Sequence, residues 1–301
     1  MKRMNILFIG GRESGKTTLA VRMLQESLFR TPNWLNLQFS VHDESVPGSF
    51  LENSESLETH APMKPMRGND FSLLTLSIRK KKIFWFTVVM EMFRKLFTGR
   101  AMTEIGGVQC RIFEMSVENP ELGKWLLRYG SGKTPLGIIL TADPFAVGST
   151  CESSHSPTIS AVVDRFTARF EQIFVGNPEK RLPFSVAVVV NKAEKFPQFL
   201  EKSKRYVDSR TLLASRRALR DSDGILPDSY LLNGILEKQS EDVRELLDRY
   251  DGNFVNILQN EFRSVRYFWS GQSADREKTS FCRMTSPLLP ILWLVGEQME
   301  F

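Results

Sequence analysis

Short apolar runs alternate with amphipathic stretches along most of the chain. Runs of four to eight apolar residues are typical of buried strands, and apolar residues spaced three and four apart are typical of helices. The pattern predicts strands over residues 5–10, 71–78, 110–115, 136–142, 186–190 and 265–269, and helices over 17–29, 159–174 and 286–299. Strands that alternate with helices in this way predict an α/β fold with a mostly parallel central sheet.

Three other segments have a different character. Residues 40–69 are rich in Ser, Glu, Pro and Gly, which predicts a mobile loop. Residues 83–97 are apolar and aromatic, and two interpretations stay open: an amphipathic helix that docks on a membrane surface or a partner, or a buried core helix. Residues 197–262 look helical, with a break at 222–227.

A chain of 301 residues is long enough for one large domain or two small ones. We predict a single domain over residues 1–301, with an inserted mobile region at 31–108 and a helical insertion at 197–262.

The first predicted strand runs into a glycine-rich segment that matches the phosphate-loop pattern GxxxxGK[ST]. In this pattern the main-chain N–H groups and the start of the following helix face phosphate oxygens. We expect Lys16 to reach the β- and γ-phosphates and Thr17 to ligate Mg²⁺. The predicted fold is therefore a P-loop NTPase three-layer sandwich. The nucleotide-binding residues expected here are Gly10, Gly11, Arg12, Glu13, Ser14, Gly15, Lys16, Thr17 and Thr18.

Composition narrows the function classes. The chain of 301 residues has 42% hydrophobic and 25% charged residues, which are ordinary values for a globular domain. Its three cysteines and three histidines are scattered, which argues against a disulfide framework or a zinc site and predicts a cytoplasmic protein.

The net charge of +5 comes from the first half of the chain, largely from residues 79–100. This basic stretch is either a contact for a membrane surface or an acidic partner, or a solvated face. Its aromatic residues sit in an apolar run rather than on a stacking surface, so no specific nucleic acid is expected.

The predicted strand 186–190 continues directly into Asn191-Lys192-Ala193-Glu194. Here the chain resembles the Ras-like P-loop GTPases, whose base-recognition motif is NKxD after a core strand. The resemblance implies that Asn191 ties the base loop to the phosphate loop, that Lys192 packs on the base, and that Glu194 binds the guanine edge. Glutamate keeps both acceptor oxygens of the family's aspartate but is one methylene longer, so guanine is expected with weaker selectivity.

Two further stretches extend the resemblance. Residues 269–271 (WSG) look like the last GTPase motif, which implies that Ser270 and Gly271 lie at the base. Residues 137–144 (GIILTADP) and 287–295 (PLLPILWLV) resemble the bacterial double-GTPase group. That group is associated with bacterial conflict and signalling systems, which implies a switch with a protein effector or a partner GTPase.

The chain departs from the GTPase pattern where the family has DxxG at the end of its third core strand. Residues 114–117 (EMSV) stand there, so Glu114 replaces the metal-linked aspartate and no glycine follows. Glu118 is a candidate for orienting water. Residues 104–107 (EIGG) are a second candidate for the motif, although no predicted strand precedes them.

Other catalytic parts are not fixed by the sequence. Thr103, or alternatively Thr59, is the candidate for the switch threonine that closes on Mg²⁺ in the family. Arg12 is either a built-in cation for the γ-phosphate or a solvent-facing side chain.

Together these features predict a switch protein that binds GTP and GDP with Mg²⁺ and hydrolyses GTP slowly. Lys16 and Glu114 are the predicted catalytic residues, and Thr17 and Glu114 the predicted metal ligands. The alternatives are a catalytically inactive pseudo-GTPase that acts as an interaction module, and a P-loop ATPase.

Overall fold

The computed structural model describes residues 2–11, 14–29, 37–41, 72–80, 107–130, 133–142, 164, 168, 181–191, 230–270 and 286–298. The predictions for residues 42–69, 83–97 and 197–229 lie outside the described residues, as do most of those for 159–174. The predicted domain organisation, with its two insertions, stays a prediction.

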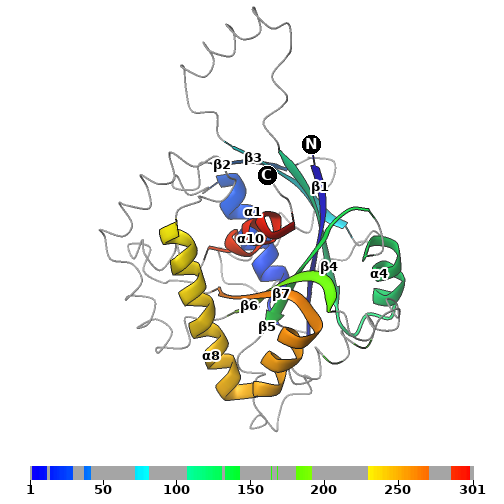
Figure 1. Cartoon of the computed structure of the whole chain (residues 1–301). Helices are drawn as coiled ribbons and strands as arrows, with labels where there is room; N and C mark the ends of the chain where they lie inside the picture. Colours follow the sequence, from blue (N-terminus) through cyan, green and yellow to red (C-terminus); the bar gives the residue numbers. More distant parts are fainter. Residues whose placement is uncertain are drawn as a thin grey trace, which may run out of the picture.

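A seven-stranded sheet forms the centre of the molecule, in the order β2-β3-β4-β1-β5-β6-β7 (Figure 1). Its strands are β1 Lys2–Gly10, β2 Leu37–Val41, β3 Ser72–Lys80, β4 Val108–Ser116, β5 Leu136–Ala142, β6 Leu182–Val190 and β7 Phe262–Trp269. The strands β4, β1, β5, β6 and β7 pair in parallel, while β3 is antiparallel to both β2 and β4. The prediction of an α/β fold with a mostly parallel sheet is confirmed.

Helices cover both faces of this sheet. The described helices are α1 Lys16–Phe29, α4 Leu122–Gly130, α8 Tyr230–Glu261 and α10 Leu289–Gln298. The helices α1 and α10 lie side by side against one face, and α4 and α8 pack on the other (Figure 1). The architecture is therefore the predicted three-layer sandwich. Among the described residues, no helix is long and apolar enough to cross a lipid bilayer.

Alternation along β1 explains the two layers of core. Ile6 and Phe8 face α1 and α10, whereas Leu7 and Ile9 face the layer that contains α4 and α8. Successive side chains of a strand point to opposite faces, so a strand buried on both faces reads as a continuous apolar run. Every residue of β5 is buried for the same reason.

Two elements were not predicted. The prediction of a loop from residue 40 is wrong at its start, because Ser40 and Val41 end β2, which pairs with β3 at the edge of the sheet. A strand of five residues shows little alternation of polar and apolar positions. The polar composition of the following residues therefore led to the prediction of a loop.

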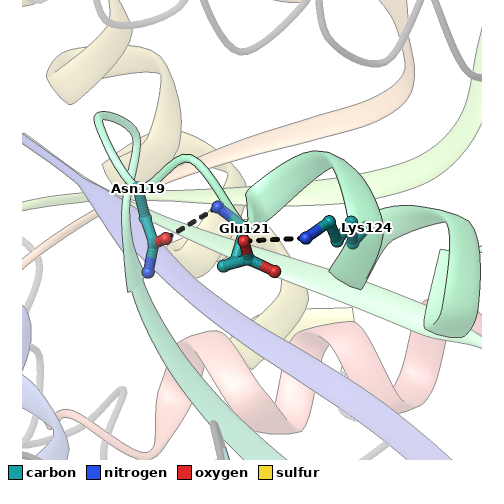
Figure 2. A network of polar contacts seen from close by, with 3 residues as sticks. All are labelled: Asn119, Glu121 and Lys124. Carbon is teal, nitrogen blue, oxygen red and sulfur yellow. Dashed lines mark hydrogen bonds and ion pairs between the residues drawn. The ribbon is translucent and has the colours of Figure 1, made fainter.

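The second missed element is α4, which follows β4 after a tight turn. The Asn119 side-chain oxygen accepts a hydrogen bond from the Glu121 N–H at 2.9 Å, and Glu121 is paired with Lys124 at 3.0 Å (Figure 2). Such an Asn turn provides backbone partners just before a helix. The helix then buries Leu122, Trp125 and Leu126. Their spacing of three and four residues is the pattern from which this helix could have been predicted.

Candidate functional site

The predicted site residues that the structure describes gather at the carboxyl ends of the parallel strands. The strand β1 lies between β4 and β5. After β1 the chain first builds the sheet on one side of it, with β2, β3 and β4, and then on the other side, with β5, β6 and β7. In open α/β sheets, ligands bind at such a point, outside the carboxyl ends of the strands. Here Gly10 ends β1 and α1 begins at Lys16, so the described residues among 10–17, called the phosphate loop below, lie at that point.

Two glycines are required by the shape of the phosphate loop. Gly15 has φ of 83°, and a Cβ there would lie 2.8 Å from Asn191 Nδ2. A Cβ on Gly10 would lie 2.6 Å from Ser14 Oγ and 2.7 Å from the Thr141 carbonyl oxygen. The chain therefore packs too closely at both positions for any larger residue.

The Lys16 ammonium group lies against the phosphate loop itself. Its Nζ donates to the Gly10 and Gly11 carbonyl oxygens at 3.1 and 2.5 Å, and to Ser14 Oγ at 3.5 Å. Burial lowers the pKa of Lys16, and the carboxylates of Glu114 and Glu118 oppose that shift. A buried cation held by oxygens at a helix N-terminus is suited to bind an anion.

The side chains of Thr17 and Glu114 meet beside the ammonium group. The Thr17 hydroxyl donates to Glu114 Oε1 at 2.6 Å, and Glu114 reaches this position from β4, the parallel neighbour of β1. Glu114 Oε2 is buried without a hydrogen-bond partner. Burial raises the pKa of Glu114, while the Thr17 hydrogen bond and the Lys16 charge act to lower it.

These two residues fit Mg²⁺ chemically. Hydroxyl and carboxylate oxygens are hard ligands, and Mg²⁺ at a nucleotide takes few protein ligands because phosphates and waters supply the rest. The unpartnered Oε2 atom of Glu114 is an oxygen that a cation would satisfy. The described residues contain no cluster of three or more His, Cys, Asp or Glu side chains able to hold a metal without a nucleotide.

Asn191 and Ser270 extend the site along the same edge of the sheet. Asn191 Nδ2 donates to the Ser14 carbonyl oxygen at 2.6 Å, the link to the phosphate loop that the GTPase resemblance implied. Ser270 N–H donates to the Val190 carbonyl oxygen at 2.7 Å, and Ser270 Oγ accepts from Arg22 of α1 at 3.0 Å. The ends of β6 and β7 are thus tied to the loop and to the helix that follows it.

The remaining predicted positions divide into two groups. Gly11 and Thr18 are half-buried at the loop and in the first turn of α1. The predictions for Arg12, Glu13, Lys192, Glu194, Gly271, Thr59 and Thr103 lie outside the described residues.

Of the alternative motif at 104–107, the structure describes only Gly107, which lies at the opposite end of β1 from the phosphate loop. The Gly107 carbonyl oxygen accepts from the Lys2 N–H at 3.1 Å, at the start of β1. The phosphate loop follows the other end of β1, so Gly107 is not placed to contact phosphates held there. Glu114 is the residue that the structure brings to the loop.

Several contacts of the loop were not predicted. The Val117 N–H donates to the Gly10 carbonyl oxygen at 3.3 Å. The Thr141 hydroxyl lies 2.7 Å from Ser14 Oγ, and Arg22 contacts Ser270. Val117 and Thr141 lie in stretches that the sequence analysis singled out, but no motif predicts these contacts or the contact of Arg22, because they depend on which strands are neighbours.

Comparisons with known proteins leave the family open. No family model matches the sequence, and no curated protein matches it. Solved structures match nearly the whole chain at low identity, and we report three of them.

One is the signal recognition particle receptor SRb-GTP/SRX complex from Chaetomium thermophilum, at 11% identity and a TM-score of 0.36, with 99% of this chain and 100% of that chain covered. Another is the ADP ribosylation factor-like GTP binding protein, small COPII coat GTPase SAR1, from Encephalitozoon cuniculi in complex with GDP, at 13% identity and a TM-score of 0.32, covering 98% and 82%. A third is sup35 complexed with GMPPNP, at 14% identity and a TM-score of 0.32, covering 99% and 45%. TM-scores this low do not establish function, so the function is proposed below from the residues of this chain.

Proposed function

We propose that this protein is a guanine-nucleotide-binding switch that holds GTP and GDP at its phosphate loop. The observation that carries the proposal is the meeting of Lys16, Thr17 and Glu114 at the start of α1. A cation, a hydroxyl and a carboxylate at a helix N-terminus match the needs of a triphosphate and its metal.

Binding starts with the main chain. The first N–H groups of an α-helix have no acceptor within the helix, so the start of α1 offers donors to phosphate oxygens. The Lys16 ammonium group exchanges its contacts with the Gly10 and Gly11 carbonyl oxygens for phosphate oxygens and keeps its contact with Ser14 Oγ. This exchange neutralises charge on the phosphates.

Mg²⁺ belongs to the same proposal, with Thr17 and Glu114 as the residues that would hold it. When bound, it would neutralise charge on the β- and γ-phosphates. The Thr17–Glu114 hydrogen bond already brings the two oxygens together, so little reorganisation of this chain is needed.

Guanine is the proposed base. The support is Asn191, which is anchored on the phosphate loop at the end of β6, directly before Lys192 and Glu194 in the sequence. Ser270 directly follows the neighbouring strand β7, and its hydrogen bond to Val190 supports a base site shared by both strand ends.

A binding-only protein is the second candidate, and one contact favours it. The family's DxxG glycine senses the γ-phosphate through its N–H, and Val117 stands at that position. Its N–H bonds to the Gly10 carbonyl oxygen, and its side chain is buried. Hydrolysis is therefore proposed to be slow at best, with Lys16 and Glu114 acting by charge and Glu118 as the candidate near water.

The wider setting is a proposal as well. A nucleotide-dependent switch needs an effector, so we propose a protein effector or partner GTPase and a cytoplasmic location. Membership of the bacterial double-GTPase group, and a role in bacterial signalling or conflict, stay predictions that rest on short sequence stretches alone.

Calorimetric titration tests this proposal. GTP, GDP and ATP are titrated with Mg²⁺ into the wild-type protein, Lys16→Ala and Lys124→Ala. Lys124 is a matched control, because it is also a lysine but its side chain is 79% exposed and forms an ion pair with Glu121 on α4 (Figure 2). We expect GTP and GDP to bind the wild type and Lys124→Ala more tightly than ATP does, and Lys16→Ala to lose binding.

Retained GTP affinity in Lys16→Ala would refute the assignment, and equal affinity for ATP would remove guanine from it. Single-turnover phosphate release then separates a slow GTPase from a binding-only protein.

A further inference from the structure

Thr141, near the end of β5, is not among the predicted site residues, yet its hydroxyl contacts two parts of the chain around the phosphate loop. It donates to the Ile9 carbonyl oxygen in β1 at 3.2 Å and lies 2.7 Å from Ser14 Oγ. We propose that Thr141 is a positioning residue for nucleotide binding, which acts through Ser14. The proposal rests on the proposed function of the loop.

The direction of the hydrogen bonds follows from proton count. A hydroxyl has one proton to donate, and Thr141 uses its proton on the Ile9 carbonyl oxygen. The proton between the two hydroxyls must then come from Ser14. Ser14 Oγ keeps its lone pairs for the Lys16 ammonium group, 3.5 Å away. A chain of donors thus runs from Lys16 through Ser14 and Thr141 to β1.

Donors aligned in one direction polarise one another, which strengthens each bond. The chain fixes the side chain of Ser14, which is buried, and holds one of the three oxygens that face Lys16 Nζ. Thr141 therefore influences where the ammonium group sits without touching it.

A second contact shows that Ser14 is a fixed point of the loop. Its carbonyl oxygen is held by Asn191 from β6, while its hydroxyl is held by Thr141 from β5. The loop residue between the two strands cannot turn without breaking one of these bonds. The lack of room for a Cβ on Gly10 follows from the same packing, since both hydroxyls stand beside it.

Loss of the Thr141 hydroxyl leaves the Ser14 hydroxyl buried without its acceptor. A buried unsatisfied hydroxyl is costly, so Ser14 is expected to turn toward another partner and displace the loop. We expect nucleotide affinity to fall about 5- to 30-fold, the factor that corresponds to losing one buried hydrogen bond. The loss should be the same for GTP, GDP and ATP, because the change acts on the phosphate site rather than on the base site.

The test compares Thr141→Val, which keeps the shape and removes the hydroxyl, with Thr141→Ser, which restores the hydroxyl. Ser14→Ala removes the other member of the pair. Ser185→Ala is the matched control, because Ser185 is also buried and accepts a hydrogen bond from the Ser264 hydroxyl at 2.8 Å, between β6 and β7. Calorimetric titration with the three nucleotides and Mg²⁺ gives the affinity, and urea unfolding gives the stability of each variant.

We expect Thr141→Val and Ser14→Ala to weaken nucleotide binding by similar factors. The double variant should bind no more weakly than the weaker of the two single variants, because both substitutions break the same chain of hydrogen bonds. Thr141→Ser should bind within about twofold of the wild type. Ser185→Ala should lose stability and keep its affinity.

Wild-type affinity in Ser14→Ala overturns the proposal even if Thr141→Val does not fold. A Thr141→Ser variant as weak as Thr141→Val also overturns it, because the methyl group rather than the hydroxyl would then matter. A wild-type protein that binds none of the three nucleotides refutes the proposed function and this inference together, and is thereby distinguished from failure of the inference alone.

Discussion

Replacement of Gly15 by alanine tests the geometry of the phosphate loop. An L-residue in the left-handed region costs about 1–2 kcal/mol, and Gly15 lies there with φ of 83°. The added Cβ would also lie 2.8 Å from Asn191 Nδ2, a distance at which the amide must move. The bond from Asn191 to the Ser14 carbonyl oxygen is then lost, at about 1 kcal/mol.

The two effects together predict that Gly15→Ala lowers the free energy of unfolding by about 2–3 kcal/mol. The control is Gly123→Ala in α4, where a Cβ would meet no atom within 4 Å and φ is not positive. Alanine is the better helix former, so this variant should match the wild type or gain up to about 1 kcal/mol.

Urea unfolding, followed by circular dichroism, measures both variants at equilibrium. Nucleotide titration should show a parallel loss of affinity in Gly15→Ala, because the same glycine shapes the loop. If Gly15→Ala unfolded within about 0.5 kcal/mol of the wild type, the left-handed turn and the Asn191 contact would both be wrong.

Three further predictions concern buried ionisable groups. Because burial raises the pKa of Glu114, the folded protein holds this proton more tightly than the unfolded chain, and stability falls as pH rises above the ordinary glutamate value of about 4.3. Glu114→Gln should therefore be more stable than the wild type at pH 7 but not at pH 4, as measured by urea unfolding; equal stability at pH 7 would contradict the burial of this charge. The same variant should lose most of the Mg²⁺ dependence of GTP affinity in calorimetry, and an unchanged dependence would remove Glu114 from the metal site. Burial raises the pKa of the Cys110 thiol to about 12, so mass spectrometry should find it unlabelled by iodoacetamide at pH 8 in the native protein and labelled in urea; rapid native labelling would show that β4 is exposed.

Much of the fold could be predicted because the central strands are buried on both faces. Residues 136–142 are apolar or glycine except for Thr141, residues 186–190 are apolar throughout, and both segments belong to strands in the structure. The phosphate loop could also be predicted from the sequence, because phosphate binding requires its residue types. Edge strand β2 and helix α4 were missed because short elements depend on partners that the local sequence does not name.

The contacts that complete the site were beyond sequence reasoning for a different reason. Ser14 and Thr141 are 127 residues apart and meet only because β5 pairs with β1 in a particular register. Thr17 and Glu114 likewise meet because β4 lies on the other side of β1. The sequence identifies the chemical groups, and the strand order decides which of them touch.

A crystal structure of this protein with Mg²⁺ and a non-hydrolysable GTP analogue is the most direct test of the central claim. We predict phosphate oxygens bound by the main-chain N–H groups of residues 14–17 and by Lys16, with the metal beside Thr17 and Glu114. A nucleotide bound elsewhere, or a phosphate loop still closed by the contacts of Lys16 with its own carbonyl groups, would contradict it.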